Sequence, residues 1–483
     1  MTKERTIVNR TFIFVFLSVT MNSVVVSQES WRRTYGGLDS DELRSIEQVS
    51  TGGFIAGGGT GSFGISGDSY VLRLDENGVV LWSTYFGGQG VQKVASVKEV
   101  PDGFIIAGVT SLGTNGGYDM TLSAIDVTGS MMWTKDIGSS DWDFTSDMVV
   151  LSDGYLVVGS TFGFGSQSGA ALVVRTDLSG DTIWTRLVDG AGNDEASAVC
   201  VDESGNVLVC GRMDIDTDDE DGFVSKLDPN GTILWTNRYG GDSTDYFTGI
   251  TEAWDEGYVV VGATRSYSSV VQVLIQKIGV NGDSLWQRTY GSGGDTEMRR
   301  ITKATTSGYG LVGYNTFNNA GGRDMFLISV DNDGWYLFGK NYGGLNDEEG
   351  YALGPTDDGG YIMAGISNAY GPGILAGYVV RSLFNGETDD DTVYPFLDPV
   401  SIPNQSATEA LSIFPNPTSG AFNIRSGIPI SQIRIFDGTG RIVVDQAPAS
   451  SQQEFQLDVP AGLYMVLWID RSGLSGRAPL VVE

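Results

Sequence analysis

"WRRTYGG", residues 31–37, decides the fold because close variants of it return along the chain. The stretches "WSTYFGG", "WTNRYGG" and "WQRTYGS" begin at later tryptophans, each a multiple of 51 residues further on. The repeat positions are Trp31, Trp82, Trp133, Trp184, Trp235, Trp286 and, after one step of 52, Phe338. A period of this length and regularity indicates a repeat architecture.

Each repeat contains the same series of strand and turn signals. A Gly-aromatic pair opens a short apolar run, as in "GFIIAGVT" at 103–110, and a Gly/Ser-rich loop leads to the next strand. An Asp-x-x-Gly stretch such as Asp75–Gly78 then precedes the tryptophan strand, and these residue types favour a hairpin turn. Four short strands per repeat are typical of a propeller blade. The sequence therefore predicts an all-β chain with a seven-bladed β-propeller over residues 28–386.

The seventh repeat lacks a tryptophan strand of its own. After Gly386 the chain has Asp390 where tryptophan is due, whereas Trp31–Tyr35 is a tryptophan strand without a repeat. We predict that Trp31–Tyr35 pairs with Tyr378–Leu383 and closes the ring. Each tryptophan, and the large residue four positions later, should fill the wide outer gap between neighbouring blades.

Residues 31–386 resemble secreted bacterial repeat proteins built from W-x-x-x-YGG, GGY-I-x-x-G-x-T and D-x-x-G-x-x-x-W units. This resemblance implies the propeller architecture. It implies no particular chemistry, because that family has no shared activity that the motifs carry.

Composition limits the function. The net charge of −31 argues against nucleic acid or an anionic membrane surface as a partner, since both require a cationic surface. Histidine is absent, which excludes Ser-His-Asp and Cys-His catalysis and histidine-ligated zinc. Any catalysis would depend on carboxylates, Tyr, Arg or Lys, and we expect no cofactor other than Ca²⁺.

The N-terminus has the composition of a secretory leader. Lys3, Arg5 and Arg10 precede the apolar stretch "TFIFVFLSVTM", and Ser27 offers a small-residue cleavage point. We predict a signal peptide over residues 1–27, the alternative being a retained signal anchor. No other stretch is apolar enough to span a bilayer, so we expect no transmembrane domain in the mature chain.

The C-terminal region differs in pattern from the repeats. Residues 387–408 are acidic and contain proline, which indicates a linker. Residues 409–483 contain alternating strands and predict a small antiparallel β-sandwich. Three motifs follow in order, "FPNPTSG" at 414–420, "IRIFDGTGRIV" at 433–443 and "PAGLYMVLW" at 460–468.

These motifs resemble the C-terminal sorting domain of type IX secretion cargo. The residues that carry the resemblance are Pro415, Asn416, Pro417, Gly440, Arg441, Gly462 and Tyr464. It implies the type IX machinery as a partner, passage through the Sec route and then the outer membrane, and a protein that is secreted or held at the outer cell surface. The alternative is a generic β-sandwich binding module.

An acidic residue recurs ten positions after most repeat tryptophans. Its members are Asp41, Asp143, Asp194, Asp245 and Glu348, interrupted by Gln92 and Thr296. They should ring one mouth of the central channel, where they could bind a cation or a basic ligand. The alternative is a structural carboxylate that accepts loop amides once per blade.

Inner-strand charges break the symmetry of the repeats. Asp147 and Arg300 occupy equivalent positions of different blades where other blades have small residues, and Arg299 adjoins them. Near the axis they could bind a ligand or, with Tyr351, serve a lyase or glycosidase. The alternative is packing and charge pairing.

Two further features concern metal and sulfur. "DIDTDDEDG" at 214–222 offers Asp214, Asp216, Asp218 and Asp221 to Ca²⁺, although no register gives an EF-hand and a solvated acidic loop is the alternative. Cys200 and Cys210 flank a predicted hairpin turn and could form a disulfide. Their alternative is two small buried hydrophobic side chains.

We therefore expect an exported, non-enzymatic propeller that binds an extracellular glycan or protein. Two alternatives stay open, a polysaccharide-degrading enzyme that uses carboxylate and tyrosine chemistry and a structural component of a surface layer.

Overall fold

The computed structural model describes residues 30–482 except 66, 167, 191, 217–218, 292, 318–320, 372, 389–392, 398–411, 416, 426–429, 437–441, 447–451, 458 and 471–474. The regular structure in this part of the chain is entirely β. None of it forms a helix long and apolar enough to cross a membrane. The predicted leader, residues 1–27, lies outside the described residues.

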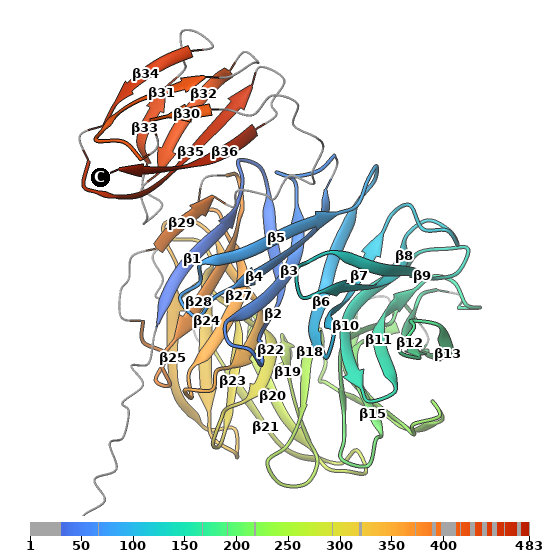
Figure 1. Cartoon of the computed structure of the whole chain (residues 1–483). Helices are drawn as coiled ribbons and strands as arrows, with labels where there is room; N and C mark the ends of the chain where they lie inside the picture. Colours follow the sequence, from blue (N-terminus) through green and yellow to red (C-terminus); the bar gives the residue numbers. More distant parts are fainter. Residues whose placement is uncertain are drawn as a thin grey trace, which may run out of the picture.

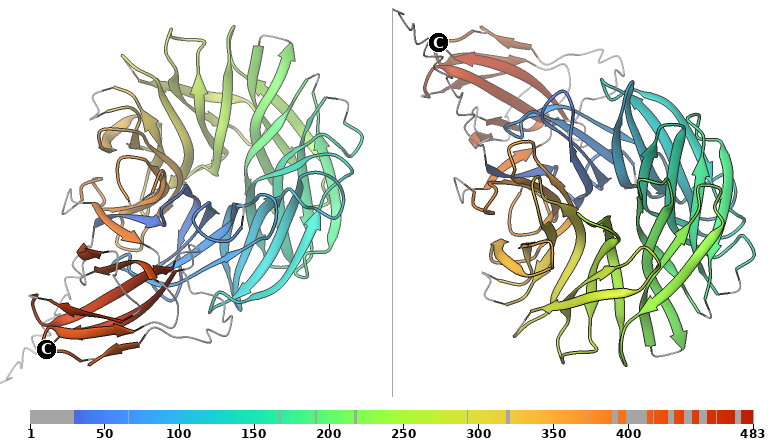
Figure 2. Two further views of the ribbon diagram at one scale, coloured as in Figure 1. Left: turned by 90° about the horizontal axis from the view of Figure 1, so that it is seen from above. Right: turned by 90° about the horizontal axis from the view of Figure 1, so that it is seen from below.

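Seven blades surround a central axis (Figures 1 and 2). Six are four-stranded antiparallel sheets of consecutive strands. The first three are β2 (Asp41–Gln48), β3 (Phe54–Thr60), β4 (Asp68–Leu74) and β5 (Val80–Phe86); β6 (Gln92–Val100), β7 (Gly103–Thr110), β8 (Asp119–Asp126) and β9 (Met131–Ile137); and β10 (Asp143–Leu151), β11 (Gly154–Thr161), β12 (Ala170–Thr176) and β13 (Thr182–Val188).

The next three blades repeat this order. They are β14 (Glu195–Val201), β15 (Val207–Asp216), β16 (Asp219–Leu227) and β17 (Ile233–Tyr239); β18 (Asp245–Glu252), β19 (Tyr258–Thr264), β20 (Gln272–Ile278) and β21 (Ser284–Tyr290); and β22 (Thr296–Lys303), β23 (Tyr309–Asn315), β24 (Asp324–Val330) and β25 (Tyr336–Tyr342). The predicted all-β, seven-bladed propeller is confirmed.

The seventh blade closes the ring with a strand from the other end of the propeller. It contains β26 (Glu348–Pro355), β27 (Tyr361–Ser367) and β28 (Ala376–Ser382), and β1 (Trp31–Gly36) pairs antiparallel with β28. Thr34 lies opposite Tyr378 in this register. The predicted closure is thus confirmed.

A fifth strand extends this blade. β29 (Val393–Leu397) runs parallel to β1, with Arg32 opposite Val393. This strand occupies part of residues 387–408, the segment that the sequence indicates as a linker. The physical reason for this pairing is that β1 would otherwise present unpaired backbone groups, which attract a further strand.

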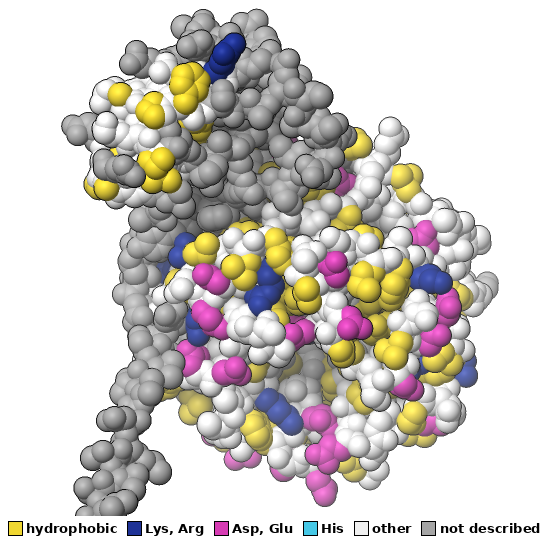
Figure 3. Space-filling view, in the orientation of Figure 1, with side chains coloured by type: hydrophobic (Ala, Val, Ile, Leu, Met, Phe, Trp, Pro, Cys, Tyr) yellow, Lys and Arg dark blue, Asp and Glu magenta, His cyan; other side chains and the backbone are white. Residues whose placement is uncertain are grey.

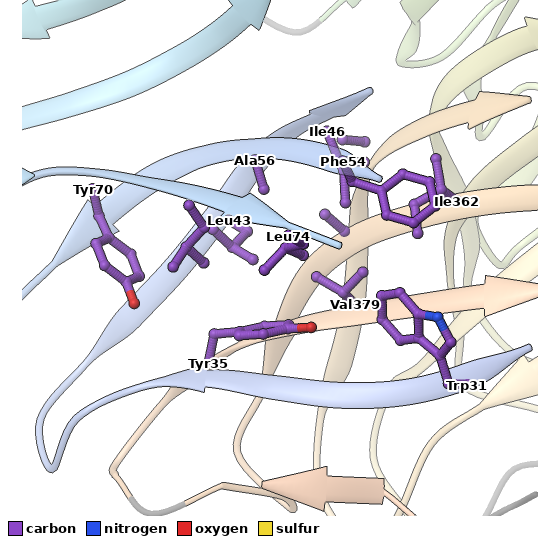
Figure 4. Packing of buried hydrophobic residues seen from close by; sticks show 13 residues of the cluster. Trp31, Tyr35, Leu43, Ile46, Phe54, Ala56, Tyr70, Leu74, Ile362 and Val379 are labelled. Atoms are coloured by element: carbon purple, nitrogen blue, oxygen red, sulfur yellow. The ribbon is translucent and has the colours of Figure 1, made fainter. Parts of the chain in front are cut away.

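Outer-strand aromatics fill the gap between blades. Trp31 and Tyr35 are buried against Phe54 and Leu74 of the first blade (Figure 4). Trp31 donates its indole N–H to the Glu76 carbonyl at 2.9 Å. The same packing places each repeat aromatic on the turn glycine of the next blade, in the pairs Trp31–Gly78, Trp82–Gly129, Trp133–Gly180, Trp184–Gly231, Trp235–Gly282, Trp286–Gly334 and Phe338–Gly386. We call these seven pairs the rim contacts.

The C-terminal region forms a small β-sandwich outside the ring (Figure 1). One sheet contains β30 (Ser412–Phe414), β31 (Ala421–Arg425) and β34 (Gln452–Gln456), and the other β32 (Ile430–Phe436), β33 (Ile442–Gln446), β35 (Gly462–Asp470) and β36 (Ser475–Val482). Phe422, Ile435 and Val466 are among the residues of its core.

The sorting-motif residues that the structure describes lie at bends and near the start of β35. Pro415 and Pro417 are exposed, whereas Asn416, Gly440 and Arg441 lie outside the described residues. Gly462 begins β35, and buried Tyr464 donates its hydroxyl to the Pro460 carbonyl at 2.7 Å.

Candidate functional site

A β-bulge interrupts the innermost strand of every blade at the same place. The register skips one residue between Leu43 and Ser45 in β2, and the corresponding skip occurs in the other six inner strands. The skipped residues, which we call the bulge ring, are Arg44, Ala95, Ser146, Ser197, Thr248, Arg299 and Tyr351. Bulges redirect a side chain out of the regular pleat and often adjoin functional sites.

The bulge ring lines a pocket on the propeller axis. Its volume is about 330 Å³, and all seven bulge residues contribute to its wall. Charged neighbours from the same inner strands complete the lining, namely Glu42, Lys93, Glu195 and Arg300. Larger hollows, such as one of about 590 Å³ lined by Trp82 and Phe104, adjoin the rim contacts instead. Only the axial pocket, among these, draws side chains from all seven blades.

Two unlike walls face each other across the axial pocket. Three consecutive blades supply Arg299, Tyr351 and Arg44, and the Arg44 guanidinium carbon lies 3.8 Å from the centre of the Tyr351 ring. Arg299 approaches the same ring at 5.6 Å, so the tyrosine carries a cation on each side. The other four blades supply the small residues Ala95, Ser146, Ser197 and Thr248.

Ion pairs fix the large side chains of the cationic wall. Glu42 accepts from Arg44 at 2.6 Å and from Lys93 at 2.7 Å. Burial raises the pKa of Glu42, but the two cations outweigh it and leave that pKa below its usual value. Arg299 pairs with Glu297 at 3.1 Å and with Glu349 at 3.6 Å. The side chains of Arg44, Lys93 and Arg299 still expose 39%, 49% and 33% of their area.

Tyr351 is held as a neutral donor. Its hydroxyl donates to Glu349 Oε2 at 2.9 Å. Burial, together with the nearby Glu349 carboxylate, raises the pKa of Tyr351 to about 12 against the opposing effect of Arg44. A phenol in this state remains protonated at neutral pH and is unsuited to act as a base.

Arg300 reaches from its own blade across the axis. Its guanidinium donates to the carbonyls of Thr248 at 2.9 Å, Ser146 at 3.3 Å and Ser197 at 3.5 Å. These acceptors come from three other blades, so Arg300 contributes to the base of the pocket and ties it together. Arg300 and Asp147 do not form an ion pair with each other, and Asp147 accepts the amides of Met148 at 2.9 Å and Val199 at 3.3 Å. Charge pairing near the axis, the alternative interpretation, is found for Arg299 with Glu297 and Glu349.

The recurring acidic residues take a structural position instead of lining the pocket. Asp41, Asp143, Asp194, Asp245 and Glu348 all have exposed fractions of 0%. Each accepts the amide four residues earlier, from Gly37, Ser139, Gly190, Gly241 and Gly344 respectively. These contacts brace the loop that enters each inner strand, and burial raises the pKa of Asp194 to about 6.

The acidic stretch at 214–222 is largely strand. Asp214 lies opposite Glu220 in the pairing of β15 with β16, so the expected loop is reduced to a tight connection. Asp214 Oδ2 accepts the amide of Asn193 at 2.8 Å. The side chains of Asp216 and Asp218 lie outside the described residues, and Asp221 lines a rim hollow. Within the described residues no three acidic or cysteine side chains form a group that could hold a metal ion.

The two cysteines are free thiols, and of the two interpretations that the sequence left open the disulfide is not formed. The register pairs Cys200 with Leu208 and Cys210 with Ala198, which places the thiols diagonally instead of opposite each other. Burial raises the pKa of both thiols, and Cys210 is completely buried. They match the alternative of small buried hydrophobic side chains.

Sequence reasoning selected Arg299 and Arg300 but missed Arg44, Glu42 and Glu195. The sequence signal for Arg44 was its position thirteen residues after a repeat position, where each of the seven repeats has a residue of a different size or charge from most of the others. This column of positions is the bulge ring. Its importance depends on the bulge, which the sequence does not mark.

Comparison with known proteins assigns the C-terminal region. Residues 412–476 match the family described as "Secretion system C-terminal sorting domain". This sorting domain indicates export by the type IX secretion system, to the cell surface or as a secreted protein.

Other similarities extend over larger parts of the chain. A regulatory protein, FlaEY, of Caulobacter vibrioides is 23% identical over 383 residues, which are 73% of this chain and 39% of that protein. Among solved structures, PorZ, a surface component of the type IX secretion system of Porphyromonas gingivalis, is 12% identical, with a TM-score of 0.38 over 94% of this chain and 70% of PorZ. The Neurospora crassa Pan2 WD40 domain is 12% identical, with a TM-score of 0.44 over 72% and 91%.

Proposed function

We propose that this protein enters the Sec route through its N-terminal leader and, once outside the cell, binds a glycan or a protein without chemical turnover. The axial pocket is the binding site. One observation carries the proposal, the contrast between the bulge ring and the rest of the repeat. A ring that served only packing would repeat one residue type around the axis, whereas this ring combines two arginines, a tyrosine and small hydroxyl residues.

The state of the ionisable groups favours binding over catalysis. Tyr351 is protonated, and Glu42 is engaged by two cations at 2.6 and 2.7 Å. Glu195, the other carboxylate of the lining, pairs with Arg212 at 2.9 Å. A general acid–base pair needs one carboxyl group with a raised pKa, whereas the pKa of Glu42 is lowered.

A binding screen on a blocked pocket tests the proposal. The full chain is applied to glycan and protein arrays with and without Ca²⁺, beside a Ser197→Trp variant whose indole would fill the pocket. Ser179→Trp, at an exposed turn, is the matched control. We expect a ligand that the wild type and Ser179→Trp retain and Ser197→Trp loses, while circular dichroism shows all three folded.

Two results would contradict the proposal. Retention of every ligand by Ser197→Trp would place the binding site elsewhere. Release of new reducing ends from a bound polysaccharide would favour the enzymatic alternative.

A further inference from the structure

The lining of the axial pocket is more basic than the protein around it. It contains four cations, Arg44, Lys93, Arg299 and Arg300, and two carboxylates, Glu42 and Glu195. The whole chain has a net charge of −31, and acidic side chains are spread over the propeller face seen in Figure 3. At physiological ionic strength charges beyond about 8 Å are largely screened, so a ligand in the pocket responds mainly to the lining and to the buried carboxylates Glu297 and Glu349 that pair with Arg299.

Arg300 supplies positive charge without a carboxylate partner. Its guanidinium donates to carbonyls of three other blades and to the carbonyl of its neighbour Arg299, and no ion pair joins it to a carboxylate of the described residues. A partly buried charge is normally compensated by an opposite charge, because carbonyl dipoles replace the lost hydration only in part. An anion in the pocket would provide that compensation.

The cationic wall has further capacity for an anion. Glu42 is shared by Arg44 and Lys93, so one negative charge serves two positive ones. Arg299 lies on the other side of Tyr351 and pairs with Glu297 and Glu349, but 33% of its side chain remains exposed to a ligand. Guanidinium groups are planar and match the two oxygens of a carboxylate, which strengthens the hydrogen bonds and fixes their direction.

The opposite wall offers hydroxyl groups that the protein itself does not use. Ser146 and Ser197 line the pocket, and neither side chain forms a hydrogen bond within the described residues. Thr248 differs, because its hydroxyl donates to the Met298 carbonyl at 2.6 Å. A ligand that bonds to both walls therefore needs an anionic group on one side and hydroxyl groups on the other.

We propose that the axial pocket recognises the carboxylate-bearing sugar of an acidic polysaccharide, that is, a uronic acid unit. Its carboxylate accepts hydrogen bonds from the exposed guanidinium groups of Arg44 and Arg299, beside Arg300, and its ring hydroxyls face Ser146 and Ser197. The volume of about 330 Å³ is at the lower end of the ~300–1,000 Å³ typical of small-molecule sites and suits a short saccharide. This inference rests on the proposed function, since it names the ligand of the same pocket.

Calorimetry with three oligosaccharides tests the ligand class. The full chain is titrated with a uronic acid oligosaccharide, with the same compound after reduction of its carboxyl groups to alcohols, and with a sulfated neutral oligosaccharide of equal length. We expect binding of the first alone. Because hydrogen bonds to a charged group contribute about 1.5–3 kcal/mol, Arg299→Gln and Arg44→Gln should each weaken it about 10- to 100-fold.

A surface variant controls for loss of charge. Lys135→Gln removes one positive charge from an outer strand, where Lys135 pairs with Asp181 at 2.7 Å, and should change the affinity less than about twofold. Arg300→Lys retains the charge but loses the planar group and should bind more weakly than the wild type. Thermal unfolding checks that each variant is folded.

The outcomes separate this inference from the proposed function. Equal binding of the reduced or the sulfated compound, or unchanged affinity in both glutamine variants, would overturn the uronic acid assignment. If the arrays then show another ligand that Ser197→Trp loses, the function stands and only its ligand class is wrong. If Ser197→Trp loses no ligand, both proposals fail.

Discussion

At the outer rim one contact is repeated around the propeller, whereas at the axis each blade presents its own side chain. The rim contacts place an aromatic ring on the turn glycine of the next blade, and Tyr35, Tyr239 and Tyr342 add a hydroxyl bond of 2.6–2.7 Å to the carbonyl of that glycine. The bulge ring has no such uniformity. The repeated positions therefore hold the blades together, and the irregular column is free to form a binding site.

Breaking the closing rim contact should produce the largest effect. Trp31→Ala removes a side chain that is 6% exposed and packs on Phe54 with ring centres 6.0 Å apart. Deletion of a buried tryptophan costs about 3–5 kcal/mol in the free energy of unfolding. Urea denaturation followed by circular dichroism measures the change.

Trp335→Ala is the matched control. This tryptophan is 57% exposed and contacts Arg288, whose guanidinium carbon lies 4.1 Å from its ring centre. An exposed cation–π contact contributes about 0.5–1 kcal/mol. If both substitutions lower the free energy of unfolding by similar amounts, the Trp31 contact that closes the ring stabilises the protein no more than an exposed surface contact does.

A pair of turn glycines isolates the rim contact from backbone strain. Gly231 and Gly205 have the same φ of +81°, but a Cβ on Gly231 would lie 2.9 Å from Trp184, whereas Gly205 has Pro229 at 3.6 Å. Gly205→Ala should cost about 1–2 kcal/mol, the penalty of the left-handed region. Gly231→Ala should lower the free energy of unfolding by this same amount and by about 1–3 kcal/mol more, because the added methyl group overpacks against Trp184.

The midpoints of urea unfolding of Gly231→Ala and Gly205→Ala measure this difference in stability. Equal losses for Gly231→Ala and Gly205→Ala would mean that the tryptophan moves aside at no cost. In that case the rim contacts would not determine how closely the blades approach.

The rim was predictable from sequence because its signals are local and recur. Tryptophan at a fixed step, and a turn glycine ahead of the next tryptophan, define both partners of each contact. The blade number and the closure by Trp31–Tyr35 follow from this periodicity. The sorting domain was predictable for the same reason, since its motifs are contiguous.

The axis was less predictable because it depends on strand register. Arg44 enters the pocket only because β2 skips one residue against β3, and no residue type marks that skip. A register offset also separates Cys200 from Cys210, which no local motif could show. Arg300 was singled out correctly as unusual, but its carbonyl partners belong to three other blades.

The buried carboxylates at the entry to the inner strands make stability depend on pH. Burial raises the pKa of Asp194 from 3.8 to about 6 in the folded state. Between these values the folded protein holds a proton that the unfolded chain releases, so this contribution to the free energy of unfolding declines as pH rises from 4 to 6. Asp194→Asn should show a weaker decline in urea denaturation across that range.

Asp126 should change stability with pH in the opposite direction to Asp194. A hydrogen bond from Thr128 at 2.6 Å lowers the pKa of this exposed carboxylate, so its contribution is present above pH 3.8 and is lost as pH falls. Asp126→Asn should therefore leave the decline between pH 4 and 6 unchanged. A parallel change in both variants would mean that general surface charge, and not burial of Asp194, sets the pH dependence.

The smallest effect should come from the bulge ring itself. Ser146→Ala removes a hydroxyl that bonds to no other described residue, while the Ser146 carbonyl continues to accept from Arg300 at 3.3 Å. We expect a change in the free energy of unfolding within about 0.5 kcal/mol, as for a surface substitution. A loss above about 2 kcal/mol would show that the axis is as structural as the rim. If Ser146→Ala leaves the free energy of unfolding unchanged but weakens binding of the pocket ligand, the Ser146 hydroxyl contacts the ligand. Its loss then affects recognition alone, because no other described residue depends on that hydroxyl for a hydrogen bond.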